Sequence, residues 1–83
     1  MFNPELANVL PNGALILHRK RVGQTWVWFA IRKHAYQPYV TWVSSVSEPG
    51  STVWGRYWSR YINGFRDFHE RIREQWSLLE QYS

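Results

Sequence analysis

Residues 14–32 read ALILHRKRVGQTWVWFAIR and contain two segments of β-type sequence on either side of Gly23-Gln24. Glycine at the first position of a two-residue loop suits a type II′ turn, so this stretch predicts a β-hairpin. Such a turn fixes the register of the two strands and leaves apolar residues on both faces. The expected opposite pairs are Val22–Thr25, Arg21–Trp26, Lys20–Val27, Arg19–Trp28, His18–Phe29, Leu17–Ala30, Ile16–Ile31 and Leu15–Arg32.

Two further strands are expected after this hairpin. Residues 39–44 are rich in aromatic and β-branched side chains, which favour strands, and Pro49-Gly50 predicts a turn after them. Residues 52–58 fit either a fourth strand or the start of the helix that follows. A helix that included them would contain both Gly55 and Gly64, each costing ~1 kcal/mol relative to alanine, so we favour the strand.

A long amphipathic helix is predicted over residues 59–82. Apolar side chains recur there at the spacing of one helix face, at Tyr61, Phe65, Phe68, Ile72, Trp76 and Leu79. Gly64 lies on that face, where the lack of a side chain would let the helix approach the sheet closely. The opposite face carries charged side chains that would be solvated and paired with one another: Arg66, Asp67, Glu70, Arg71, Arg73 and Glu74.

The whole chain, residues 1–83, is expected to form a single α+β domain, because a chain this short has room for one core. We predict a three- to four-stranded antiparallel β-meander over residues 14–58, packed by the long C-terminal helix. Asn3 and Pro4 are typical of a helix start, and they predict a short N-terminal helical turn within residues 1–13.

Composition excludes several classes of function. The chain contains no cysteine, so it has no disulfide, no thiol nucleophile and no cysteine-ligated metal or iron–sulfur site. No apolar run approaches the ~18 residues of a membrane span, and the first residues lack the features of a signal peptide. We therefore expect a soluble, cytoplasmic protein without a membrane partner. Ten Lys and Arg against six Asp and Glu give a formal net charge of +4, which favours an anionic partner.

The polar residues form no recognisable catalytic or metal-binding pattern. His18, His34 and His69 fall on separate predicted elements, so no metal site is expected. The carboxylates of the helix are spaced for salt bridges with arginines, and the sequence has no nucleophile motif and no glycine-rich phosphate loop. We expect neither an enzyme nor a bound cofactor.

The most informative cluster combines arginine and tryptophan on one predicted face of the sheet. The candidate binding residues are Arg19, Arg21, Trp26, Trp28 and Arg32. Guanidinium groups contact phosphates and indole rings stack on bases, so the cluster predicts a small nucleic-acid-binding module. Tryptophan and arginine are also preferred in protein interfaces. The alternatives are a protein-interaction or inhibitory module, a homodimer, or a face that the N-terminal segment covers.

The sequence VWGRYWS at residues 53–59, followed by FRDF at residues 65–68 and by Arg71, resembles small open reading frames of phages and mobile elements. The resemblance covers the last third of the chain. It implies a four-stranded meander that ends in an amphipathic helix, and a role in host takeover or counter-defence, and it implies no site residues. The order of elements is also similar to that of double-stranded-RNA-binding domains, whose Gly-Pro-x-His loop is absent here.

Overall fold

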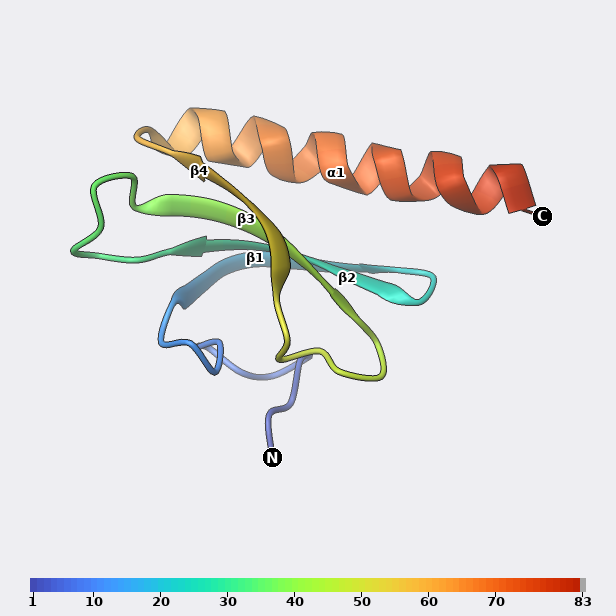
Figure 1. Ribbon diagram of the computed structural model, residues 1–83, viewed down its shortest axis with the longest axis horizontal. Helices are drawn as coiled ribbons and strands as arrows, with labels where there is room; N and C mark the ends of the chain where they lie inside the picture. Colours follow the sequence, from blue (N-terminus) through green and yellow to red (C-terminus); the bar gives the residue numbers. More distant parts are fainter. Residues whose placement is uncertain (83) are drawn as a thin grey trace.

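The computed structural model describes residues 1–82, in which a four-stranded antiparallel sheet carries one helix across one of its faces (Figure 1). The elements are β1 (Leu15–Val22), β2 (Thr25–Ile31), β3 (Tyr39–Ser45), β4 (Val53–Trp58) and α1 (Tyr61–Tyr82). The order in the sheet is β1-β2-β3-β4, so each strand pairs with its neighbour in sequence. The predicted α+β meander is confirmed, including its fourth strand and its single long helix. Ser83, the last residue of the predicted domain, lies outside the described residues.

The β1–β2 hairpin has the predicted turn. Gly23 has a φ of 60°, and Gln24 does not have a positive φ, which is the combination of a type II′ turn. The five pairs from Val22–Thr25 to His18–Phe29 are confirmed. Beyond them the register shifts, and the observed pairs are Ile16–Ala30 and Leu15–Ile31.

The three expected pairs that began at Leu17, Ile16 and Leu15 are therefore wrong. The reason is a β-bulge between Ile16 and His18, which adds one residue to β1. The bulge lets two successive side chains face the helix. Leu17 packs against the cluster under α1, and the ring of His18 stacks on Phe29 with centroids 6.0 Å apart.

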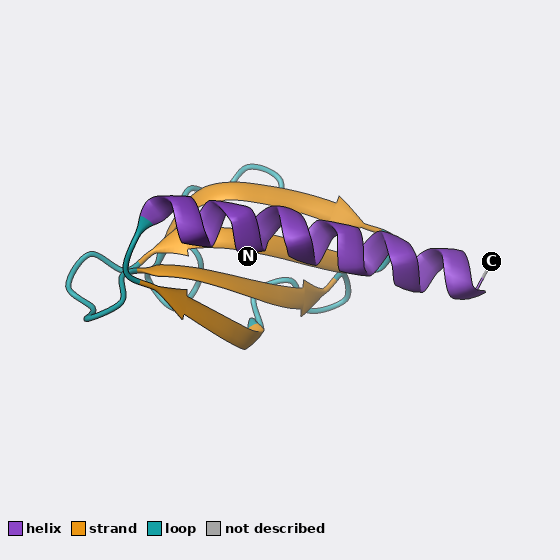
Figure 2. Ribbon diagram, turned by 90° about the horizontal axis from the view of Figure 1, so that it is seen from above, coloured by secondary structure: helices purple, strands orange, loops and turns teal. Residues whose placement is uncertain are grey.

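The helix covers the face of the sheet that carries Val27 and Phe29 of β2 (Figure 2). Phe68 of α1 is buried against both of them, and Phe65 and Ile72 pack at the margin. Gly64 is buried as well, and a methyl group at this position would lie 2.5 Å from Cε1 of Phe29. The close approach of helix and sheet that was predicted at Gly64 is confirmed.

The N-terminal segment covers the opposite face of the sheet, on the far side from α1 (Figure 1). The buried residues of this layer are Leu10, Ala14, Trp26, Trp28, Ala30, Val40 and Trp42. Phe2 packs on Trp28 with ring centroids 5.8 Å apart, and the indole N–H of Trp28 donates to the hydroxyl of Ser44 at 2.9 Å. Among the alternatives for this face, coverage by the chain's own N-terminal segment is the one observed.

The structure does not show the predicted N-terminal helical turn. A hydrogen bond from the amide of Ala7 to the carbonyl of Asn3 bends the chain here, and residues 1–13 contain no helix. Val9 then forms a β-bridge with Leu15, and the amide of Ile16 donates to the carbonyl of residue 8. Extended backbone replaces the helix here because these residues pair with the start of β1.

Candidate functional site

The two indoles of the predicted binding cluster are buried. Trp28 is 0% exposed and Trp26 is 6% exposed, and their rings stack with centroids 5.3 Å apart. Phe2 and Leu10 of the N-terminal segment lie over this part of the sheet. Neither indole is therefore accessible to a nucleic-acid base or to a partner in this structure.

The three arginines of that cluster do not converge. Arg19 lies over Trp28, 5.9 Å from the ring centroid, and donates to the carbonyl of Pro4 at 2.9 Å. Arg21 is exposed beside the β1–β2 turn, whereas Arg32 follows the opposite end of β2. The structure thus brings Arg19 together with Trp28, and it separates Arg21 from Arg32 by about 20 Å, the length of six strand residues.

A run of three cations remains on the outer strand β1, at Arg19, Lys20 and Arg21. Lys20 and Arg21 are exposed, and neither forms an ion pair with a carboxylate of residues 1–82. On α1, by contrast, Arg71 and Arg73 both pair with carboxylates of the same helix. Strand β1 therefore presents positive charge that no described carboxylate neutralises.

Strand β4, at the other edge of the sheet, is irregular at Trp54. A second register shift leaves Trp54 and Gly55 together opposite Trp42 of β3. Trp54 has a φ of 55°, and among residues 1–82 it is the one non-glycine residue with a positive φ. This left-handed conformation costs an L-residue roughly 1–2 kcal/mol and is uncommon for a bulky side chain. The bulge holds the indole in solvent, where the residue is 77% exposed.

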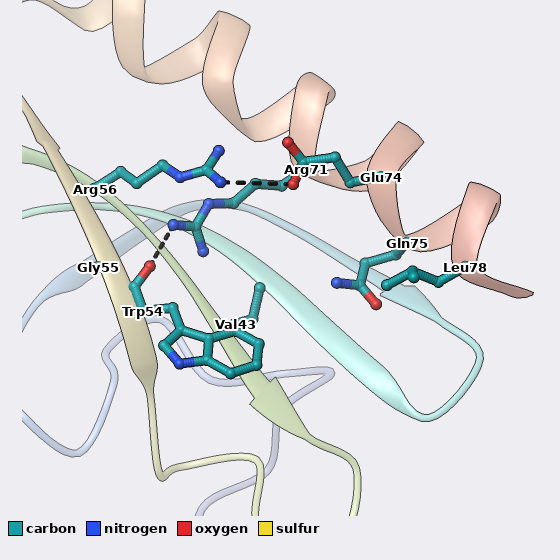
Figure 3. A pocket seen from close by; sticks show the side chains of 8 residues that line it. All are labelled: Val43, Trp54, Gly55, Arg56, Arg71, Glu74, Gln75 and Leu78. Carbon is teal, nitrogen blue, oxygen red and sulfur yellow. Dashed lines mark hydrogen bonds and ion pairs between the residues drawn. The ribbon is translucent and has the colours of Figure 1, made fainter.

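A groove of about 440 Å³ lies between β4 and the second half of α1 (Figure 3). Its walls are Trp54 on the strand side and Gln75 and Leu78 on the helix side, with Val43 of β3 between them. Charged side chains gather at one end, namely Arg56, Arg71 and Glu74. A second hollow of about 400 Å³ shares the walls of the first and continues toward Ser44 and Ser45. The two hollows form one track with a charged end, an apolar middle and a hydroxyl-lined end.

Asp67 organises the charged end of the groove. Its Oδ1 accepts a hydrogen bond from Nη1 of Arg56 at 3.0 Å, and its Oδ2 lies 3.4 Å from Nε of Arg71. The hydroxyl of the buried Thr41 also donates to Oδ2. The side chains of Asp67 and Arg71 are 9% and 4% exposed, respectively, so this ion pair is buried. Glu74 approaches only from outside, 3.6 Å from Nη2 of Arg56.

Arg71 reaches from α1 across the groove to β4 (Figure 3). Its Nη2 donates a hydrogen bond to the carbonyl oxygen of Trp54, whereas its Nε has no hydrogen-bond partner. Burial, together with the nearby cation of Arg56, lowers the pKa of Arg71. The hydrogen bond with Asp67 raises the pKa of Arg56. The positive charge of Arg71 is therefore less well stabilised by its surroundings than the positive charge of Arg56.

Sequence spacing predicts Asp67 and Arg71 on a solvated helix face, and this expectation is wrong in one respect. Their ion pair forms, but it is buried because the bulged strand β4 lies beside it. Glycine after a tryptophan within a strand was a signal of a bulge near residue 54. That signal does not place the positive φ on Trp54, since glycine is the residue that normally adopts it.

The chemistry that this groove offers is recognition of apolar and charged groups. It contains an exposed indole, aliphatic walls, two guanidinium groups and a carboxylate. Among residues 1–82, no three His, Asp or Glu side chains converge in an arrangement that could hold a metal ion. No helix in the same part of the chain has the length and apolar character needed to cross a membrane.

The fold and the groove define this chain as a small sheet-and-helix domain with an exposed tryptophan at the edge of a partly charged groove. No family model, curated protein or solved structure matches it.

Proposed function

We propose that this protein is a binding module that takes a segment of a partner protein into the groove between β4 and α1. The observation that supports this proposal is Trp54, a bulky residue that is both 77% exposed and held at a φ of 55°. Residues in sparsely populated backbone conformations cluster at ligand-binding sites, where the surrounding structure maintains the strain. Tryptophan is also among the residues that contribute most to protein interfaces.

The surroundings of Trp54 have the composition of an interface. Val53 and Leu78 are 49% and 45% exposed, and Leu78 lines the groove together with the indole of Trp54. Charged side chains of Arg56 and Glu74 lie at the rim. An apolar centre with a polar rim is typical of a protein-binding surface. The volume of the groove, about 440 Å³, is enough for one or two side chains of a bound segment.

The groove is also preorganised for binding. The hydrogen bond from Arg71 to the carbonyl of Trp54 ties the bulge to the helix. Asp67 forms an ion pair with Arg71, and the hydroxyl of Thr41 donates a hydrogen bond to the same carboxylate. A site that is already ordered loses less conformational entropy when a partner binds, which favours affinity.

Nucleic acid is the second candidate partner. The supporting observation is the run of Arg19, Lys20 and Arg21 on β1, of which the last two are exposed and unpaired with any described carboxylate. Phosphate contacts by such a run would give affinity that falls steeply with salt. The burial of Trp26 and Trp28 removes base stacking from this candidate, so we rank it second.

The test is a selection of peptides from a random library on the purified protein, with Trp54→Gly as the comparison. We expect selected peptides to bind the wild-type protein at least about tenfold more tightly than Trp54→Gly, as for an interface hot spot. Tyr36→Ala is the matched control, since Tyr36 is 97% exposed on the β2–β3 connection and does not line the groove. Equal binding by Trp54→Gly would overturn the proposal.

A parallel measurement with a single-stranded and a duplex oligonucleotide separates the two candidates. Binding that weakens with salt and is lost in the double variant Lys20→Gln, Arg21→Gln would support nucleic acid. If that double variant leaves peptide binding unchanged, the groove and β1 act independently. Oligonucleotide binding without any selected peptide would replace the first proposal by the second.

A further inference from the structure

We propose that the groove selects a peptide segment in which a carboxylate side chain lies next to an apolar side chain. This inference rests on the proposed function and adds the chemistry of the ligand. It follows from three features of the groove: a guanidinium with unused donors, a buried cation under it, and an apolar wall beside both.

Arg56 has hydrogen-bonding capacity that the protein itself does not use. Its Nη1 donates to Asp67, but the nearest carboxylate oxygen to its Nη2, on Glu74, is 3.6 Å away. That separation is too long for a hydrogen bond. The side chain of Arg56 is 44% exposed and lines the groove, so a ligand in the groove can reach it. A planar guanidinium with an open edge is well suited to a carboxylate.

Arg71 adds a second positive charge beneath this edge. Asp67 serves both arginines, with one oxygen toward each, and it also accepts from Thr41. The buried Nε of Arg71 is left without a hydrogen bond. In the less polar surroundings of a partly buried site, such a cation attracts a nearby anion more strongly than it would in water. Without Glu74, the two arginines and Asp67 leave one net positive charge at this end of the groove, and that charge favours an incoming carboxylate.

Glu74 occupies the position that a ligand carboxylate would take. Its side chain is 45% exposed, and its contact with Arg56 is the longest of the described ion pairs, at 3.6 Å. Exposed ion pairs of this kind contribute little to stability, so Glu74 can be displaced readily. We infer that Glu74 competes with the ligand for Arg56. Removing its charge should strengthen binding of an acidic ligand.

The apolar requirement comes from the wall next to these charges. Val43 and the indole of Trp54 line the groove next to Arg71, and Leu78 lines it farther along α1, beyond Gln75 (Figure 3). An apolar side chain that follows the carboxylate in an extended segment would lie against them. A nucleic-acid backbone offers no such side chain, and its phosphates would also approach the carboxylate of Glu74. The combination favours an acidic and apolar peptide.

Two pools of eight-residue peptides test this inference by fluorescence anisotropy. The pools share random flanks and differ only at their centre, which is Glu-Leu in one and Gln-Leu in the other. We expect the acidic pool to bind the wild-type protein about tenfold or more tightly than the amide pool, the effect of one charge-assisted hydrogen bond. Arg56→Gln should abolish this preference, and Glu74→Gln should raise the affinity for the acidic pool.

Arg73→Gln is the matched control for Arg56→Gln. It also removes one positive charge, but from an exposed position of α1 that lies outside the groove. It should leave the preference unchanged. If Arg56→Gln proves unstable, the gain expected of Glu74→Gln still tests the inference. If the two pools bind equally and Trp54→Gly still binds peptides more weakly than the wild type, the inference is overturned and the proposed function stands. Failure of both pools to bind, while peptides selected from the random library still bind, would overturn the inference alone; failure of the library selection as well would contradict the proposed function.

Discussion

Arg71 of α1 donates a hydrogen bond to the carbonyl oxygen of Trp54 in β4, 17 residues earlier in the chain. This bond connects a buried ion pair to a strained backbone position. Because Asp67 holds Arg71 and Arg71 holds the bulge, the placement of an exposed indole depends on residues in the core. Stability and binding should therefore respond differently to substitutions along this chain of contacts.

Substitution of Trp54 by glycine should leave the protein at least as stable as the wild type. Glycine adopts a positive φ without the penalty of a Cβ atom, and the indole has little packing to lose. Trp54→Ala is the control, since alanine retains the strain. In urea unfolding, we expect Trp54→Gly to exceed Trp54→Ala by about 1 kcal/mol. A less stable glycine variant would show that the left-handed conformation is not strained.

Asp67→Asn should destabilise the protein by about 3 kcal/mol, because it leaves the buried guanidinium of Arg71 without its counter-ion. Glu70→Gln removes a carboxylate from the same helix, where the pair with Arg73 is exposed, and should cost less than about 0.5 kcal/mol. Chemical denaturation of both variants measures the contrast. Similar losses in the two would mean that burial of the Asp67 pair is energetically unimportant.

Gly64→Ala should destabilise the fold even though alanine is the better helix former. The added methyl group would meet the ring of Phe29, which is fully buried, and the overlap should cost about 1–3 kcal/mol. Ser77→Ala, at an exposed position of α1, should change stability by less than about 0.5 kcal/mol. A rise in melting temperature for Gly64→Ala would show that the helix can shift away from the sheet.

Leu10→Ala tests whether the N-terminal segment belongs to the core. Leu10 is 1% exposed against the tryptophan face, so the substitution should cost about 2–5 kcal/mol. Leu6→Ala is the control, since Leu6 is 76% exposed in the same segment. Tryptophan fluorescence should shift to longer wavelength only in the first variant, as water reaches the buried indoles. Equal stability of the two variants would show that the segment packs loosely.

Much of the fold follows from local patterns in the sequence. The turn at Gly23 and the alternation of apolar residues determine the hairpin register as far as His18. The apolar stripe of the helix correctly predicts that Phe65, Phe68 and Ile72 pack on the sheet, whereas Tyr61, Trp76 and Leu79 of the same stripe are exposed. The bulge near Leu17 escapes such reasoning because nothing in an apolar run marks an extra residue. The cover over Trp28 escapes it too, since the N-terminal segment has no periodic pattern.

The candidate site was less predictable than the fold. Arg19 and Arg21 do share a face with Trp26 and Trp28, as the alternation implies. What the sequence does not reveal is that this face is covered, or that Trp54, at 77% exposed, is far more accessible than Trp26 and Trp28. The backbone at Trp54 goes against the intrinsic preference of the residue, and the bond that holds it comes from the helix. Such a conformation is set by tertiary contacts and has no local signal.

The bulge at Trp54 also affects how the sheet meets other molecules. Strand β4 is one outer strand and β1, with its three adjacent cations, is the other. Bulges and edge charges both discourage the pairing of an outer strand with a strand from another chain. Both outer strands are therefore poor templates for fibril-like, edge-to-edge growth of the sheet.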